Sequence, residues 1–518
     1  MSRQLKGALA LFILGIIVIV IIKVLVPIFS AKKQIETSDA KATKGSIFIG
    51  VDNWIGYYPL CSKEMKTRMR SGGYKLECVY DSANYVERIK QLKKGALNLA
   101  AATVDSYVLN GVKEDYPAVI IMIIDESKGG DAFLARKDKL ANLEELKTKD
   151  FKIAFTPNSP SEYMLKALGS HFDIPRLKTS GLWQVKTNGS SEALTKLISG
   201  KVDAAVLWEP DVSKALSEEG ILKLMSTADT SKLIVDVLLV NRDYSKDQPD
   251  IVNLVLSSYF KTLKKYRDNP DLLLKEVTEV TKLEKSQVQI MLKGVNWVNL
   301  NDNAKLWFGI SQPGKISYEW LIDTIDSTVA TLIDNSDFSK TPLPDEDPYR
   351  IINSSFIEGL FVHGLVEQFH SNDTKTIDSS LEMGFVALNE EGWKNLQEVG
   401  TLKIDLINFM SGTSTLSIQG KEELDKAVNN LKHYPRFRVL IKGHTGLRGD
   451  KDANLRLSQE RAEAVKQYLT VTYNINPNRL HAVGYGSNEP LTRKAGEPDR
   501  AYDYRLPRVE LYLVSEVY

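Results

Sequence analysis

Residues 47–59 read IFIGVDNWIGYYP, an apolar strand that leads directly into a polar and aromatic loop. The pattern recurs along the chain, with further strands expected at residues 76–80, 97–102, 119–124 and 152–155. Apolar residues at helical spacing, residues 86, 89 and 92, lie between two of these strands. Strands that alternate with helices predict an α/β fold with a parallel sheet whose faces are covered.

The loops that follow these strands are the places to search for a binding site, because ligands collect at the carboxyl ends of parallel strands. Their polar and aromatic side chains are the candidates for a ligand-binding cleft: Asn53, Trp54, Tyr57, Ser82, Asp105, Asp125, Ser127, Asp131, Ser159, Ser161, Trp208 and Glu209. Serines and helix N-termini favour an anion, whereas the carboxylates favour an ammonium group, so the charge of the ligand stays open. Serine and aspartate also cap helices routinely, and the two tryptophans can be plain core residues.

Three motifs in this segment occur together in a known family: Trp-x-Gly-Tyr at 54–57, the turn at 127–131, and GKVDAA at 200–205 followed by Trp208-Glu209-Pro210. In these motifs and their order, residues 45–335 resemble the extracytoplasmic substrate-binding proteins of ABC importers, in the branch that includes nitrate, taurine and sulfonate binders. The resemblance implies two α/β lobes that are joined by a hinge and close over a small solute.

Composition and motifs argue against an enzyme. The chain has no nucleophile elbow, no phosphate-binding glycine loop and no histidine pair at metal spacing among its six histidines. We therefore expect no catalysis, no cofactor and no metal. Because 67 Lys and Arg nearly cancel 66 Asp and Glu, there is also no electrostatic case for nucleic acid as a partner.

The only two cysteines, Cys61 and Cys78, lack the partners of a zinc site. In an exported chain they can form one disulfide, worth about 3 kcal/mol of stability. Two unpaired core thiols are the alternative.

The C-terminal residues 393–518 follow a different pattern and predict a compact α+β domain. Strands are expected at 402–409, 436–442, 480–484 and 509–514, and helices at 421–432 and 454–469. Residues typical of a known family are Gly443-His444-Thr445, Gly449, Leu457-Ser458, Arg461-Ala462, Gly484-Tyr485-Gly486-Ser487 and Arg508-Val509-Glu510. With this spacing the segment resembles the OmpA-like domain that binds peptidoglycan noncovalently.

The OmpA resemblance implies a peptidoglycan site made from Thr445, Asp450, Asn454, Arg461 and Arg508. In the family, an Asp after Gly-x-Thr and an Arg on the next helix hold the charged end of the diaminopimelate stem residue. Arg461 has the position of that Arg, but Gly446 has that of the Asp, which removes a contact worth about 1.5–3 kcal/mol. Asp450 is the candidate substitute. Alternatively the domain serves protein contacts or dimerisation, Arg461 pairs with a nearby Glu, and Asn454 caps its helix.

Residues 7–29 are almost entirely apolar. About 23 residues at roughly 1.5 Å each cross a hydrocarbon core of about 30 Å. The run exceeds the apolar core of a signal peptide and lacks a good cleavage site, so residues 1–35 are predicted to be a retained transmembrane helix, with a cleaved signal as the alternative. Residues 336–392 are rich in breakers and are assigned to a connector, in which 356–369 should dock or form a short helix.

These parts predict a single-pass protein of the bacterial inner membrane with its globular domains in the periplasm. It would capture or sense a small-molecule solute and attach to peptidoglycan. The alternative is a non-enzymatic scaffold or accessory subunit with a degenerate cleft. One span followed by an OmpA-like domain resembles flagellar motor protein B, which would add a multi-span membrane protein as partner. The span here lacks the carboxylate that proton transfer needs.

Overall fold

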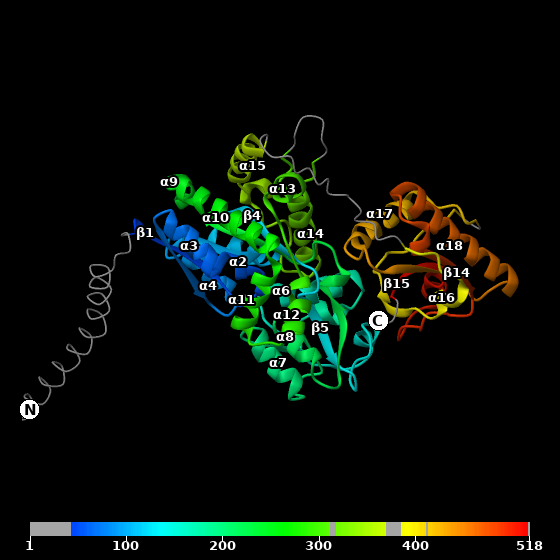
Figure 1. Cartoon of the computed structure of the whole chain (residues 1–518). Coiled ribbons are helices and arrows are strands. Elements are labelled where there is room, and N and C mark those ends of the chain that lie inside the picture. Colours follow the sequence, from blue (N-terminus) through cyan, green and yellow to red (C-terminus); the bar gives the residue numbers. More distant parts are fainter. Residues whose placement is uncertain (1–42, 311–316, 369–384, 411–412, 516–518) are drawn as a thin grey trace, which may run out of the picture.

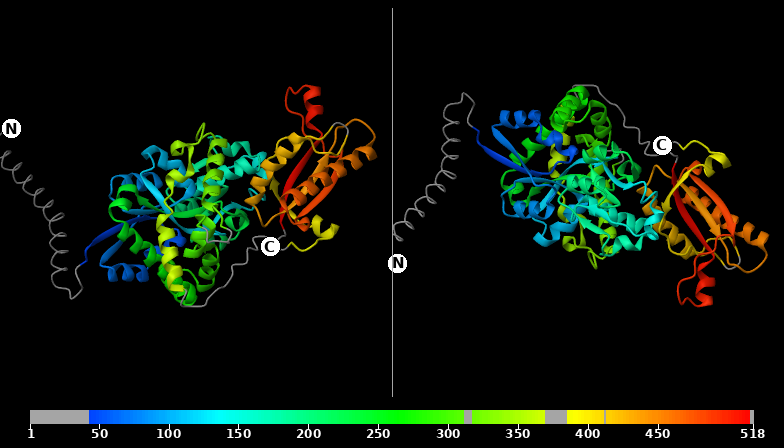
Figure 2. Two further views of the ribbon diagram at one scale, coloured as in Figure 1. Left: turned by 90° about the horizontal axis from the view of Figure 1, so that it is seen from above. Right: turned by 90° about the horizontal axis from the view of Figure 1, so that it is seen from below.

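The computed structural model describes residues 43–310, 317–368, 385–410 and 413–515. Within these ranges, no helix is both long enough and apolar enough to cross a membrane. The predicted span at residues 7–29 lies outside the described residues. The described chain forms two α/β lobes and a C-terminal α+β domain, which lies at one end of the molecule in all three views (Figure 1, Figure 2).

The first lobe is built on a six-stranded sheet with the order β11-β4-β10-β3-β1-β2. Its strands are β1 (Gly45–Val51), β2 (Tyr74–Tyr80), β3 (Leu99–Thr103), β4 (Ala118–Ser127), β10 (Val235–Asn241) and β11 (Val295–Trp297). Helices that pack around them include α3 (Lys63–Ser71), α4 (Tyr85–Lys93), α5 (Val104–Gly111) and α10 (Pro249–Asp268).

The expectation of a purely parallel sheet is wrong for this lobe. Strand β1 pairs in parallel with β2 and β3, but β10 is antiparallel to both β3 and β4. The reason is the path of the chain, because β10 returns from the second lobe and inserts between β3 and β4. The four predicted strands of this lobe are confirmed, and all ten residues of β4 are buried, as expected of a central strand.

The second lobe has a five-stranded sheet with the order β7-β6-β8-β5-β9, in which β5 is also antiparallel to its neighbours. Its strands are β5 (Asp131–Arg136), β6 (Ile153–Phe155), β7 (Gln184–Lys186), β8 (Ala204–Trp208) and β9 (Ile221–Ser226). Its helices include α6 (Pro160–His171), α7 (Ser190–Ile198) and α8 (Asp211–Leu216), while α14 (Trp320–Asp334) packs against helices of both lobes.

Two short crossovers connect the lobes: residues 128–130 lead from β4 to β5, and residues 227–234 lead from β9 to β10. The Oγ atoms of Ser127 and Thr227 are 2.7 Å apart, and the Gly129 N–H donates to Thr227 Oγ1 at 2.9 Å. The two crossovers are therefore tied to each other, which is the arrangement expected of a hinge.

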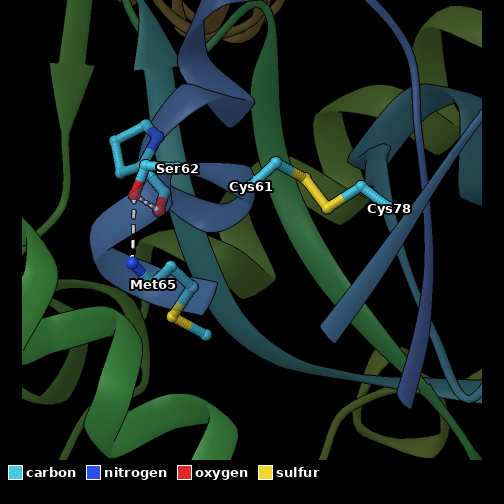
Figure 3. Close-up of a disulfide and its surroundings, with 5 residues drawn as sticks. Cys61, Ser62, Met65 and Cys78 are labelled. Atoms are coloured by element: carbon cyan, nitrogen blue, oxygen red, sulfur yellow. Dashed lines mark hydrogen bonds between the residues drawn. A yellow bond between two sulfur atoms is a disulfide. The ribbon is translucent and has the colours of Figure 1, made fainter. Parts of the chain in front are cut away.

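A disulfide joins Cys61 and Cys78, whose Cα atoms are 6.1 Å apart (Figure 3). It links the end of α2 (Tyr58–Cys61) to strand β2. Next to it, the Ser62 side chain accepts a hydrogen bond from the Met65 N–H and so caps α3. The crosslink closes a loop with a sequence separation of 17 residues, a length for which disulfides contribute about 3 kcal/mol.

Residues 336–361, which the sequence assigns to a connector, pack on the lobes: Asp337 bonds to Lys166 of the second lobe, and the segment around Asn353 lies on the first lobe. The Asn353 N–H donates to the Ile120 carbonyl at 2.9 Å, beside strand β4. Residues 355–368 form α15 (Ser355–Gln368), which buries Phe356, Ile357 and Phe361. The apolar stretch thus both forms a helix and docks, because its aromatic side chains cover the lobe.

The C-terminal domain has a four-stranded sheet with the order β12-β15-β13-β14. Its strands and main helices are β12 (Gln397–Thr401), α17 (Ile418–Lys432), β13 (Arg438–His444), α18 (Lys451–Tyr473), β14 (Leu480–Gly486) and β15 (Arg508–Ser515). The strand expected at 402–409 is wrong, since the ladder ends at Thr401. Leu402 and Ile407 are buried, which gives these residues a strand-like pattern. Their pairing is limited to the Leu402 N–H, which donates to the Leu511 carbonyl at 2.8 Å, and an isolated bridge between Phe409 and Leu416.

The C-terminal domain contacts the two lobes through a histidine pair. His433 stacks on His171 of the second lobe, with ring centroids 5.5 Å apart, and the His171 Nδ1 atom lies 2.7 Å from the Tyr434 hydroxyl. His433 also lies within hydrogen-bond distance of the Ser231 carbonyl, in the second crossover, and of the Ser327 hydroxyl on α14. The domain therefore docks next to the hinge.

Candidate ligand-binding cleft and candidate wall-binding site

A small cavity of about 20 Å³ lies between the lobes. The residues that line it come from both lobes: Asp52, Trp54, Tyr85, Thr103, Ile234 and Asp236 from the first, and Asp131, Pro160 and Trp208 from the second. The lobes touch around it, because the Trp208 indole N–H donates to Asn53 Oδ1 at 3.1 Å and the Asn110 amide donates to the Asn158 carbonyl at 3.1 Å. The cleft is thus described in a closed form.

Trp54 forms one wall of the cavity and is fixed from two sides. Its backbone N–H bonds to Asp52 at 2.9 Å, and its indole N–H donates to Asp125 at 3.2 Å. The ring lies against Gly130 of the first crossover, where an added Cβ would come within 2.1 Å of the indole. Only glycine fits there, so the crossover and the wall of the cleft are in direct contact.

Asp52 is held in place by a buried arginine. The Arg88 guanidinium donates to Asp52 at 3.0 Å, to Asp81 at 2.7 Å and to the Ala101 carbonyl at 2.6 Å. The Tyr85 hydroxyl adds a hydrogen bond to Asp52 at 3.1 Å. Because Arg88 is only 1 % exposed and is shared between two carboxylates, its charge is compensated within the first lobe.

Several other carboxyl groups at the cleft have raised pKa values. Burial raises the pKa of Asp105 and of Asp131 to about 7. Asp125 and Asp236 are opposite each other on β4 and β10. Burial raises the pKa of both groups well above its ordinary value, and the charge of Asp125 adds to the rise at Asp236. The Tyr57 hydroxyl donates to Asp236 Oδ1, and the other carboxyl oxygen, Oδ2, has no hydrogen-bond partner among the described residues. These carboxyl groups are therefore protonated more readily than exposed ones.

Four buried oxygen atoms at or beside the cavity have no hydrogen-bond partner in the described part of the chain. They are Asp236 Oδ2, Asp105 Oδ1, Thr156 Oγ1 and Ser161 Oγ. Asp236 lines the cavity itself, and Ser161 follows Pro160, which also lines it. Buried polar atoms are rarely left unpaired in a folded protein, so these oxygens make the cavity a candidate ligand site.

The predicted cleft residues occupy four kinds of position. Trp54, Asp131 and Trp208 line the cavity; Asn53, Tyr57 and Asp125 hold or bridge its walls. Asp105 and Ser161 are buried beside it and have unpaired oxygens. The remaining four have other surroundings: Ser82 is exposed, Ser127 bonds to the second crossover, Ser159 caps α6, and Glu209 bonds to Ser213 in the first turn of α8.

Sequence reasoning missed Asp52, Tyr85, Arg88 and Asp236. Asp52 is the first residue after β1, the position that the loop argument favours. Asp236 is the single charge within the apolar residues 233–240, and a carboxylate inside a buried strand is the signal that points to it.

In the C-terminal domain, Arg461 on α18 is half-buried. Its guanidinium lies 5.0 Å from the centre of the Phe409 ring, and its Nε donates to the Thr413 carbonyl at 3.2 Å. Burial lowers the pKa of Arg461, and no ion pair with it occurs among the described residues. Thr445 Oγ1 is buried without a hydrogen-bond partner in the same set of residues. A cation without a counter-charge is ready for a carboxylate ligand.

The other predicted wall-binding residues have protein partners. Asp450 caps α18 through the Ala453 N–H, and Asn454 donates to the Arg448 carbonyl at 3.0 Å. Arg508 donates to Glu510 at 2.6 Å. At Gly446 an added Cβ would meet nothing within 4 Å, so the position of the family's Asp is open space here.

Comparison with known proteins identifies the class of the C-terminal segment. Residues 408–503 match the OmpA family, so they form an OmpA-type domain. Similar proteins include the peptidoglycan-associated lipoprotein of Brucella melitensis, 31% identical over 87 residues, which are 17% of this chain and 51% of that protein. Outer membrane porin F of Pseudomonas aeruginosa is 28% identical over 121 residues, 23% of this chain and 34% of that protein. The chain therefore spans about half or less of these relatives.

Solved structures similar to the two lobes include the alkanesulfonate-binding protein SsuA from Xanthomonas axonopodis, with 16% identity and a TM-score of 0.43 over 59% of this chain and 96% of that one. The nitrate-binding protein NrtA from Synechocystis has 12% identity and a TM-score of 0.45 over 65% and 94% of the two chains. With scores at this level, the two-lobed architecture is assigned from its strand orders and its two crossovers alone.

Proposed function

We propose that this protein is a solute receptor of the bacterial cell envelope, which binds a small molecule between its lobes and attaches to peptidoglycan through its OmpA-type domain. The observation that carries the proposal is the interlobe cavity, where side chains of both lobes meet and buried oxygens lack partners within the described ranges. Two crossovers that are tied to each other supply the hinge. We infer no catalytic role for the protein.

The proposed location is the periplasm, with residues 7–29 as a single inner-membrane span. The disulfide supports an oxidising compartment, because such crosslinks persist mainly in exported domains. Peptidoglycan as a partner is supported by the OmpA match and by the relative that is named for its association with peptidoglycan.

A second candidate function is an envelope scaffold with a degenerate cleft that binds no solute. The small volume of the cavity favours it, since about 20 Å³ holds little more than one water-sized group. The distinguishing experiment is a thermal-shift screen of the full chain in detergent against amines, sulfonates, nitrate and amino acids. A saturable rise in Tm supports the receptor, and no rise with any compound supports the scaffold.

For the wall contact, we expect Arg461→Ala to reduce retention on purified sacculi by about ten- to a hundredfold, because one charge-assisted contact is lost. Arg456→Ala is the matched control, since Arg456 is an exposed arginine on the same helix. Co-sedimentation of both variants with sacculi measures the effect. Equal retention of the Arg461 variant and the control would remove Arg461 from the proposed site.

A further inference from the structure

We infer that the cleft binds the primary ammonium group of a small organic amine. This inference rests on the proposed receptor function and adds the chemical class of the ligand. Three independent features of the cavity carry it: its carboxyl groups, the engaged hydrogen-bond donors of its lining, and its size and aromatic walls.

At pH 8, above the pKa of about 7 of Asp131, the carboxyl groups at the cavity give it a negative charge. Three of the nine lining residues are aspartates, and Asp105, Asp125 and Glu209 are buried close behind them. The nearby cations already have carboxylate partners: Arg88 bonds Asp52 and Asp81, Lys166 bonds Glu162 and Asp337, and Lys214 bonds Asp211. An anionic ligand would meet several carboxylates without a spare counter-charge, whereas a cation is attracted.

The side-chain donors that line the cavity are all engaged, and the hydroxyls beside it that are unpaired within the described residues, those of Thr156 and Ser161, can accept as well as donate. Trp54 donates to Asp125, Tyr85 to Asp52, Thr103 to Ser106 and Trp208 to Asn53, and these four are all the side-chain donors that line it. The two helix N-termini beside it, those of α5 and α6, are capped by Thr103 and Ser159. Asp236 Oδ2, by contrast, has no partner among the described residues. The lining itself therefore favours a ligand that supplies donors, as an ammonium group does.

The volume of the cavity and its aromatic walls favour a primary ammonium group over a quaternary one. Aromatic rings of Trp54, Tyr85 and Trp208 surround the position, and a cation gains energy from such rings. The volume of about 20 Å³ accepts one water-sized group, which matches –NH3⁺. A trimethylated nitrogen is larger than this space, so the closed lobes should discriminate against quaternary amines.

The test measures binding to the full chain in detergent at pH 8 by isothermal titration calorimetry. Ethanolamine, butylamine and putrescine are the primary-amine probes, with choline as the N-trimethyl match of ethanolamine, and ethanesulfonate, nitrate and Ca²⁺ as competing classes. We expect saturable binding of at least one primary amine, choline weaker by about a hundredfold than ethanolamine, and no binding of the competing classes.

Substitutions of aspartates that line the cavity test whether the amine binds in the cleft. Two cleft variants, Asp236→Asn in the first lobe and Asp131→Asn in the second, should each lower the affinity for the amine by about ten- to a hundredfold. The surface control Asp138→Asn should leave the affinity unchanged. Unchanged affinity in both cleft variants, when circular dichroism shows them folded, would overturn the placement. Binding of ethanesulfonate, nitrate or Ca²⁺ in preference to the amines would overturn the ligand class and leave the receptor function standing. Binding of no probe would count against both.

Discussion

Replacement of Arg88 by methionine should lower the free energy of unfolding by about 3–5 kcal/mol, the range for breaking a buried ion pair from one side. Methionine has similar length but no charge, so the variant leaves Asp52 and Asp81 without their common cation and the Ala101 carbonyl without a donor. Urea unfolding followed by circular dichroism measures the loss. The effect is large because desolvation of the two carboxylates is no longer offset.

The matched control is Arg136→Met, which breaks an ion pair with Asp138 on the surface at 3.2 Å. Exposed pairs of this kind contribute about 0–1 kcal/mol. Adding Asp52→Asn and Asp81→Asn to the Arg88 variant should restore part of the stability, since the buried charges are then gone. If Arg88→Met and Arg136→Met unfold at the same urea concentration, Arg88 does not organise the wall of the cleft.

Replacement of Asp131 by asparagine should stabilise the ligand-free protein at pH 8 and weaken its binding of the ligand. The carboxyl of Asp131 has a folded pKa of about 7, caused first by burial, against about 3.9 in an unfolded chain. Above pH 7 the group is ionised in both states, and the folded state bears the cost of a buried charge. Substitutions at positions that serve only the fold usually have the opposite effect on stability.

The pH dependence fixes the sign of this effect. Between about pH 4 and pH 7 the folded state binds a proton at Asp131 that the unfolded state has lost, so its contribution to stability falls as the pH rises. The stability gap between Asp131→Asn and the wild type should therefore be larger at pH 8 than at pH 5 by roughly 2–3 kcal/mol. Chemical unfolding of both proteins at the two pH values measures it, and a gap that does not change with pH would contradict the raised pKa.

The comparison between variants is needed because other buried groups titrate in the opposite direction. Burial lowers the pKa of His171 to about 3 and also lowers that of His433. Unfolding allows both histidines to bind protons below about pH 6.5, so they destabilise the protein as the pH falls. Both histidines are present in the wild type and in the Asp131 variant, so their contribution cancels in the difference.

The sequence pattern predicted the strands β1 to β4 and β6 because each consists of a short apolar run. It could not place Asp236 in the cleft, since that position depends on β10 crossing back from the second lobe and inserting between β3 and β4. Local sequence says nothing about such a return. The serines show a related limit: Ser159 and Ser161 look alike in sequence, yet one caps α6 and the other has a free hydroxyl.

In the C-terminal domain the motif spacing located Arg461 on the long helix α18, but not its surroundings. Its contacts with Phe409 and Thr413 depend on residues that precede α17, about fifty positions away. The apolar residues 402–409 misled the strand prediction because burial alone produces a similar pattern. Pattern therefore identified the domain, and tertiary packing decides which side chains are free to bind.

The most direct test of the whole account uses sacculi that carry the bound full-length protein and are then equilibrated with a radiolabelled primary amine selected by calorimetry. We predict that the amine is retained on the sacculi at one molecule per chain. Asp236→Asn should release the amine and leave the protein bound, and Arg461→Ala should release both. Protein that stays on the sacculi but retains no amine, although the same protein binds it in solution, would contradict a receptor that works while it is attached to the wall.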